Sequence, residues 1–95
     1  MYLQVVDNEV KSNKKREYMQ EAIKFSNDLR EVSGCIESHV FSDDDSNVVT
    51  ILSNWNSEDD MNSDESNQVF LSHKNELKPF FIKNKTSIFK KMDLK

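Results

Sequence analysis

Two side chains of this 95-residue chain stand where they could do chemistry. His73 follows Phe70 by three residues and precedes Leu77 by four, so the three share one face of a helix. On an apolar face an imidazole can act as a general base or as an axial ligand to haem iron, or it can be a structural histidine. Trp55, the only tryptophan, ends an apolar run and offers an aromatic wall and an indole donor, or core packing alone.

The other reactive groups show no pattern typical of a metal site or a nucleophile. Asp43–Asn47 is acidic like a calcium loop, but Val48 stands where such a loop needs glycine and Asn54 where it needs glutamate. Cys35, the only cysteine, has no zinc-ligand spacing and no disulfide partner, and at the start of an apolar strand it is typical of a small buried hydrophobe. His39 lies beside acids on a hairpin strand and is interpreted as a surface residue. We expect no bound metal.

The elements that must position these side chains follow from hydrophobic periodicity. Apolar residues recur at helical spacing from Lys14 to Ser33, and Gly34, the only glycine, follows as a left-handed C-terminal residue. A second helix is capped by Ser57, is interrupted around Asn62–Asn67 and ends at Pro79. Strands are predicted at residues 2–10, 35–42, 48–55 and 80–91, the middle two joined as a hairpin.

The strand that ends at Trp55 is apolar on both of its faces. Val49 and Ile51 lie on the same side as Trp55, while Val48 and Leu52 lie on the other. The chain has enough helix to cover only one face of a sheet. Leaving the other face of the sheet exposed to solvent costs about 1.5–3 kcal/mol for each large apolar side chain. We therefore expect a second copy of the chain to cover that face.

The element order βαββαβ predicts an α+β, ferredoxin-like fold. In this fold an antiparallel four-stranded sheet carries both helices on one face. One glycine and one proline leave no flexible linker, so residues 1–95 are expected to form a single domain. The expected assembly is a homodimer.

Charge and hydropathy exclude several classes of protein. Between Glu31 and His73 there are 10 carboxylates and no Lys or Arg, which leaves all 13 basic residues and 17 − 10 = 7 acids elsewhere. Such an acidic middle argues against nucleic-acid binding. The longest apolar run, residues 48–52, is far too short to span a membrane, and no signal pattern begins the chain. With a single cysteine, a cytoplasmic location is expected.

The ordered set of these features resembles the antibiotic biosynthesis monooxygenase (ABM) domain. The resemblance runs from about residue 2 to residue 92 and implies a dimeric α/β barrel, in which two sheets pack face to face. The features that carry it are Gly34-Cys35, the acidic turn, the strand ending at Trp55, the sequel Asn56-Ser57-Glu58, then Phe70 and Leu77-Lys78-Pro79-Phe80.

The resemblance implies an oxidoreductase, although ABM members differ in their chemistry. They include cofactor-free oxygenases of aromatic quinols, haem-degrading enzymes, enzymes that process small signalling molecules and members with no known reaction. The expected activity here is a monooxygenase that uses dioxygen on a small aromatic or quinol-type substrate, with no organic cofactor. Members typically carry a histidine nine residues after the tryptophan, where this chain has Asp64, and an aspartate replaces an imidazole base only if burial raises its pKa.

The site implied by the resemblance lies between the sheet and the helices. His73 would act as the base, while Trp55 and Asn8 would orient the substrate. The other substrate-binding residues would be Asn54, which would assist the developing oxyanion, Phe25, Phe70 and Asp64.

Two alternatives stay open. The haem-degrading branch uses a first-strand asparagine, the strand-end tryptophan and a helix histidine, roles that Asn8, Trp55 and His73 could fill, although the family histidine aligns with Lys74. The second alternative is a non-catalytic, dimeric small-molecule-binding module that has lost the family's base.

Overall fold

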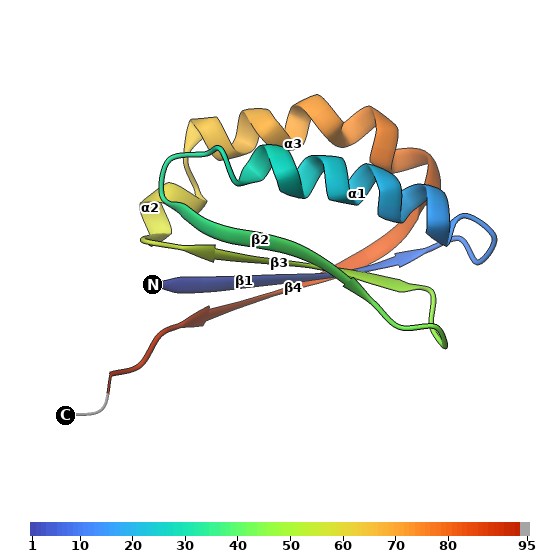
Figure 1. The fold of residues 1–95 in the computed structure, drawn as a ribbon, viewed down its shortest axis with the longest axis horizontal. Coiled ribbons are helices and arrows are strands. Elements are labelled where there is room, and N and C mark those ends of the chain that lie inside the picture. Colours follow the sequence, from blue (N-terminus) through green and yellow to red (C-terminus); the bar gives the residue numbers. More distant parts are fainter. Residues whose placement is uncertain (94–95) are drawn as a thin grey trace.

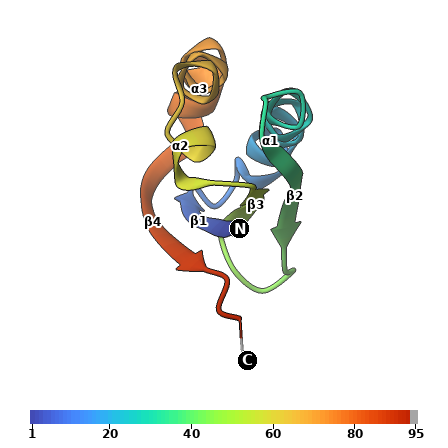
Figure 2. The same cartoon turned by 90° about the vertical axis from the view of Figure 1, so that its left-hand side faces the viewer.

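The computed structural model describes residues 1–93 and contains one antiparallel sheet with its helices on one face (Figures 1 and 2). The strands β1 (Tyr2–Val10), β2 (Cys35–Ser42), β3 (Val48–Trp55) and β4 (Phe81–Lys90) lie in the order β2-β3-β1-β4. The helices are α1 (Lys15–Leu29), the short α2 (Glu58–Met61) and α3 (Asp64–Leu77), and a 3-10 turn, η1 (Lys78–Phe80), leads into β4. The predicted ferredoxin-like βαββαβ fold is confirmed, and each strand matches its predicted range to within one residue.

The first helix forms where periodicity predicts it, but it ends earlier. α1 buries Tyr18, Ala22 and Leu29, which lie on its apolar face. The predicted end at Ser33 is wrong, because the chain turns after Leu29, and the Val32 N–H donates to the Leu29 carbonyl at 3.0 Å. This turn carries Val32 into the core, where its side chain is 3% exposed. Burial of Val32 therefore takes precedence over another turn of helix.

Gly34 adopts the left-handed conformation that the sequence predicts, but in the turn before β2 and not at the helix end. Its φ is +86°, a value that side chains with a Cβ rarely adopt. A Cβ built on Gly34 would lie 2.2 Å from the Cγ of Asp60. α2 therefore packs directly against this backbone, and only glycine fits there.

The interruption between the two helices of the second helical region is shorter than predicted. Ser57 caps α2 as expected, with its Oγ accepting a hydrogen bond from the Asp60 N–H at 3.1 Å. The predicted interruption over residues 62–67 is confined to two residues, because Ser63 caps α3 by accepting from the Ser66 N–H at 3.1 Å. The early start of α3 brings its first turn over the sheet.

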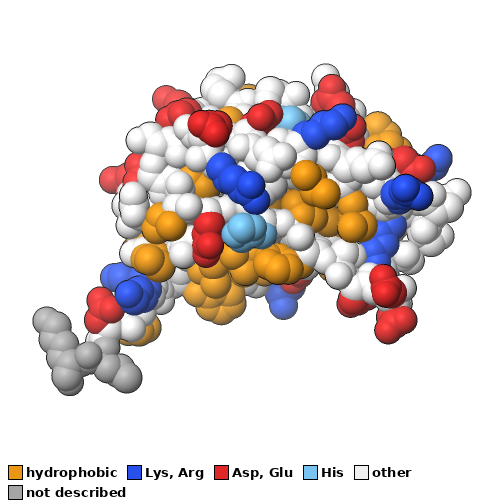
Figure 3. All heavy atoms as spheres, in the orientation of Figure 1, with side chains coloured by type: hydrophobic (Ala, Val, Ile, Leu, Met, Phe, Trp, Pro, Cys, Tyr) orange, Lys and Arg blue, Asp and Glu red, His pale blue; other side chains and the backbone are white. Residues whose placement is uncertain are grey.

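The two faces of β3 differ as the sequence predicts. Val49, Ile51 and Trp55 are buried beneath the helices, while Val48 and Leu52 are half-buried on the opposite face. No helix within residues 1–93 covers that opposite face, which we call the open face. Hydrophobic side chains gather along the underside of the molecule (Figure 3). By strand register, the apolar residues of the open face are Leu3, Val5, Phe41, Val48, Leu52 and Phe89.

Candidate functional site

A cavity of about 470 Å³ lies between the helices and the covered face of the sheet. Its lining comes from strands β1, β3 and β4 and from all three helices and the α2–α3 connection. The apolar lining residues are Val6, Tyr18, Phe25, Leu29, Ile51, Met61, Phe70 and Leu77. The polar ones are Gln4, Asn8, Ser53, Asn62, Ser63, Asp64, Ser66, Asn67, Asn84 and Thr86.

Four of the seven predicted site residues line this cavity. Asn8 reaches it from β1, Phe25 from α1, and Asp64 and Phe70 from α3. The Phe25 and Phe70 rings meet edge to face, with their centroids 6.4 Å apart and their planes at 81°. The cavity therefore has an aromatic wall made by two helices, and Asp64 is its only carboxylate among residues 1–93.

Asn8 has little freedom to turn. Its side chain is 3% exposed, and its Nδ2 donates to the carbonyl oxygens of Val6 at 3.2 Å and Val49 at 3.1 Å. Because both amide hydrogens are thus engaged, the group that Asn8 can offer a ligand is its acceptor, Oδ1.

Trp55 is fully buried and does not line the cavity itself. It packs in a cluster with Leu29, Val32 and Met61, beneath the helices. Its indole Nε1 donates to the Oε1 of Gln4 at 3.3 Å, and Gln4 does line the cavity. Trp55 can therefore act on a ligand through the Gln4 amide, and through the packing of Leu29 and Met61, which also line the cavity.

His73 points toward α1 and does not line the cavity. Its Nε2 lies 2.5 Å from the Oδ2 of Asp28, and its ring meets Phe25 edge to face at 5.7 Å. Residues three apart on a helix differ by about 60° in direction, so α3 turns Phe70 into the cavity and His73 onto the neighbouring helix. The structure thus separates His73 from the cavity.

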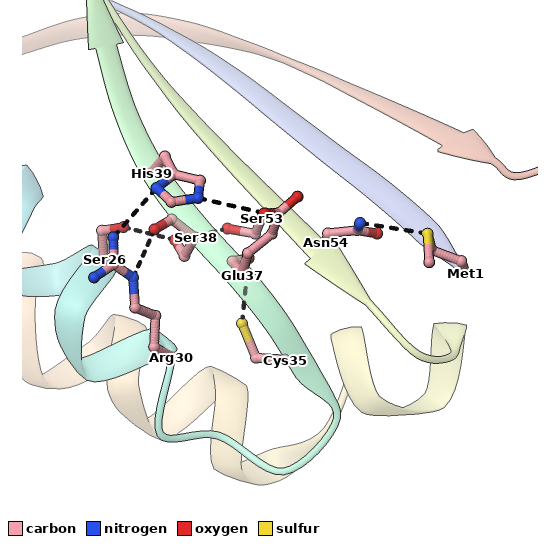
Figure 4. A network of polar contacts seen from close by, with 9 residues as sticks. All are labelled: Met1, Ser26, Arg30, Cys35, Glu37, Ser38, His39, Ser53 and Asn54. Carbon is pink, nitrogen blue, oxygen red and sulfur yellow. Dashed lines mark hydrogen bonds and ion pairs between the residues drawn. The ribbon is translucent and has the colours of Figure 1, made fainter.

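Asn54 lies on the open face of the sheet, opposite the cavity. Side chains alternate along a strand, so Ser53 and Trp55 point toward the helices and Asn54 points away. Its Nδ2 contacts the Met1 sulfur at 3.3 Å, and its buried Oδ1 has no hydrogen-bond partner within residues 1–93 (Figure 4). The structure does not bring Asn54 together with the other predicted residues.

A chain of buried hydroxyl groups runs from the cavity into the α1–β2 interface (Figure 4). The Oγ of Ser53, which lines the cavity, lies 3.1 Å from the Oγ of Ser38. The Oγ of Ser38 in turn lies 2.7 Å from the Oγ of Ser26. None of the three is more than 2% exposed. At the far end the Arg30 Nε donates to the Ser38 carbonyl oxygen at 2.8 Å. These contacts satisfy polar groups that would otherwise weaken the core.

Tyr18 is the phenol of the cavity wall, and burial raises its pKa from 10.0 to about 12. The unfolded chain therefore loses this proton first as the pH rises. The stabilisation from the neutral, buried phenol is fully present below pH 10 and is lost as the pH approaches about 12.

We expect the free energy of unfolding to fall across this pH interval. Urea denaturation at a series of alkaline pH values measures it, with Tyr18→Phe as the control. The variant should show a smaller fall, and equal slopes for the two proteins would contradict a neutral, buried Tyr18.

The surroundings of Cys35 disfavour the thiolate form that a nucleophile needs. The thiol is free and half-buried, and desolvation by burial raises its pKa, although a contact with the Glu37 carbonyl oxygen opposes the shift. A protonated thiol is a poor nucleophile. Residues 1–93 also contain no cluster of three His, Cys, Asp or Glu side chains placed to hold a metal ion.

A family model described as antibiotic biosynthesis monooxygenase matches residues 1–75. The chain belongs to this family. No curated protein sequence matches it. No helix within residues 1–93 has the length and apolar character needed to cross a membrane.

Solved structures share the ABM fold over nearly the whole chain. SnoaB, a cofactor-independent oxygenase from Streptomyces nogalater, is 13% identical with a TM-score of 0.80, and the match covers 98% of this chain and 94% of SnoaB. A Mycobacterium tuberculosis protein is 9% identical with a TM-score of 0.77 and coverages of 99% and 98%. A conserved Methanosarcina mazei protein is 22% identical with a TM-score of 0.71 and coverages of 97% and 94%. At these identities the likeness shows the fold and not the reaction.

The residues of this ABM cavity do not fit haem. Among residues 1–93 the lining contains no histidine or cysteine as an axial ligand, and no lysine or arginine to pair with the propionates. The Nε2 of His73 is engaged by Asp28. The raised pKa of Tyr18 disfavours a phenolate ligand, and Met61 alone is a weak one. The cavity therefore does not support the haem-binding alternative.

Sequence reasoning missed several polar residues of the ABM cavity, above all Gln4 and Ser53. Both stand on the covered face of otherwise apolar strands, where a polar side chain must find a partner or a ligand. Reading β1 and β3 in alternate positions, with attention to polar residues on the buried side, would have found them.

Proposed function

We propose that this protein is a monooxygenase that oxygenates a small, quinol-type aromatic molecule in the cavity, with no organic cofactor. The observation that carries the proposal is the cavity lining, which combines the Phe25–Phe70 wall with neutral amides and hydroxyls. Such a lining suits a flat, uncharged molecule with a few polar groups. The cofactor-independent activity of SnoaB, which has the same fold, supports the class of reaction.

The proposed reaction balances without an external reductant. A hydroquinone loses a hydroxyl proton to a base, and the resulting anion gives one electron to dioxygen. Recombination of the two radicals forms a carbon–oxygen bond and, after protonation, a ring hydroperoxide. Loss of water from the hydroperoxide leaves a hydroxyquinone, so one oxygen atom enters the product, the other leaves as water, and the quinol supplies all the electrons.

The proton acceptor in this proposal is Asp64, at the exposed edge of the cavity, and not His73. Because Asp64 lacks the burial that would let it replace an imidazole base, we assign it to passing the substrate proton on to water. Asp64 is the carboxylate that lines the cavity, whereas His73 contacts Asp28 outside it. Asn8 offers an acceptor that can hold a substrate hydroxyl group.

Incubation with naphthohydroquinone and isotopically labelled dioxygen tests the function. We expect the label in hydroxynaphthoquinone, measured by mass spectrometry, at a rate above the protein-free rate. Unlabelled naphthoquinone formed at the protein-free rate, with the label in hydrogen peroxide, would contradict oxygenation. Binding without labelled product would instead support the non-catalytic module.

Phe70 and Leu71 provide a matched pair of variants for this assay. Both are on α3 and are 45% and 46% exposed, but only Phe70 lines the cavity. Phe70→Ala removes one ring of the aromatic wall, so we expect KM for the quinol to rise about ten-fold. Leu71→Ala should leave KM unchanged. A similar KM change in both variants would place the substrate elsewhere.

We infer that the protein acts as a homodimer, as its open face suggests. Phe41 and Phe89 on this face are 52% and 55% exposed in one protomer. Packing against the same face of a second copy would bury them together with Leu52 and Val5. The partners of the protomer are thus a second copy, a small aromatic molecule and dioxygen.

We propose the cytoplasm as the compartment. The free thiol of Cys35 supports this assignment, because reducing conditions keep such a thiol from oxidising.

A further inference from the structure

The amide of Gln4 is held in one orientation by Trp55. An indole N–H can only donate a hydrogen bond, so the Gln4 atom that faces it must be the oxygen, Oε1, at 3.3 Å. Trp55 is 0% exposed and packed against Leu29, Val32 and Met61, so the indole cannot turn away. The amide nitrogen of Gln4, Nε2, is therefore the end that is left to donate a hydrogen bond to another group.

The Nε2 of Gln4 is a spare donor at the cavity. Gln4 lines the cavity, and no acceptor within residues 1–93 takes a hydrogen bond from Nε2. No lysine or arginine lines the cavity among those residues, so this amide stands there without a competing cation. It can donate to a carbonyl oxygen or to a singly charged oxyanion.

Asn8 presents the opposite polarity on the same strand. Its amide hydrogens are engaged by backbone carbonyl oxygens, which leaves an acceptor. Gln4 and Asn8 lie four residues apart on one face of β1, a Cα separation of about 13 Å. The floor of the cavity thus has a donor at one end and an acceptor at the other.

We propose that Gln4 is a specificity-determining residue, which binds the carbonyl or oxyanion oxygen of the ligand while Asn8 accepts from its hydroxyl group. The inference rests on the proposed function and deepens it, because it assigns an orientation to the quinol. Trp55 is a positioning residue that acts by holding the Gln4 amide. The oxyanion formed on proton loss lies at Gln4, the spare donor.

The test compares two probes of similar shape, naphthoquinone and naphthalene, by isothermal titration calorimetry. Only naphthoquinone carries carbonyl acceptors. Gln4→Met keeps the length of the side chain without the amide, and we expect it to weaken naphthoquinone binding about ten-fold while leaving naphthalene binding unchanged. Trp55→Phe frees the amide to turn and should weaken naphthoquinone binding about three-fold. Gln68→Met, an exposed glutamine on α3, is the control and should change neither affinity.

A second variant protects the test against a folding defect. Gln4→Glu keeps an acceptor for the Trp55 indole but replaces the donor with a second oxygen and a negative charge, so it should also lose the preference for naphthoquinone over naphthalene. Equal naphthoquinone affinity in the wild type and in folded Gln4→Met or Gln4→Glu would overturn the role of Gln4 and leave oxygenation standing. Failure of the wild type to bind naphthoquinone would overturn this inference, while the labelled-dioxygen assay separately decides the proposed function.

Discussion

Replacing Trp55 with alanine is expected to lower the free energy of unfolding by about 3–5 kcal/mol. The side chain is 0% exposed and forms the centre of a cluster with Leu29, Val32 and Met61. Its removal leaves a large void and also deprives the Gln4 Oε1 of its donor. In a domain of this size such a loss is a large part of the total stability. Urea or guanidinium denaturation followed by far-UV circular dichroism measures it.

Two further variants test whether the loss comes from the buried volume of Trp55. Trp55→Phe keeps most of the apolar volume, so we expect it to cost clearly less than Trp55→Ala. Leu71→Ala, at a residue 46% exposed on α3, should change stability by less than about 0.5 kcal/mol. A Trp55→Ala loss as small as that of Leu71→Ala would show that this cluster is not part of the core.

Replacing Leu52 with aspartate is expected to convert the proposed homodimer into a monomer. Leu52 stands near the middle of the open face, between Val5 on β1 and His39 on β2. A carboxylate there would lose its hydration when two open faces meet, with the neighbouring His39 imidazole as a group that could pair with it, at a cost of about 3–5 kcal/mol. That cost weakens the dimer by more than a hundred-fold. Sedimentation velocity at micromolar concentration distinguishes the two masses.

The control for Leu52→Asp places the same charge on the helical side of the molecule. Leu71→Asp on α3 lies outside the open face and should leave the dimer intact. Circular dichroism should show that both variants keep the fold. A wild-type protein that sediments as a single compact chain would contradict the dimer, whatever the variants do.

Local pattern was sufficient to predict most of the fold. The alternation in β3 separates Val49 and Ile51 from Val48 and Leu52, and the structure buries the first pair and leaves the second half-buried. The helical period in α1 likewise predicts a buried face. These patterns succeed because the period of a strand or a helix is set by the backbone itself.

Element boundaries depended on contacts that are distant in sequence. The predicted helix end at Ser33 was wrong because Val32 is drawn into the core beside Trp55, which lies more than twenty residues further along the chain. Gly34 is left-handed as predicted, yet what makes glycine necessary there is also the approach of Asp60 from α2. Neither contact is visible from residue spacing.

The candidate site shows the same division most clearly. The sequence, through its resemblance to the ABM family, predicts the ABM fold and names Asn8, Phe25, Phe70 and Asp64, and these four residues line one cavity. The structure leaves the other predicted site residues, His73, Trp55 and Asn54, out of the cavity lining. His73 is rotated by about 60° from Phe70 around the axis of α3, so its side chain contacts Asp28. Asn54 precedes Trp55 by one residue on β3, so its side chain lies on the opposite face of the sheet. Periodicity tells which residues share a face, but the neighbouring elements decide what that face meets.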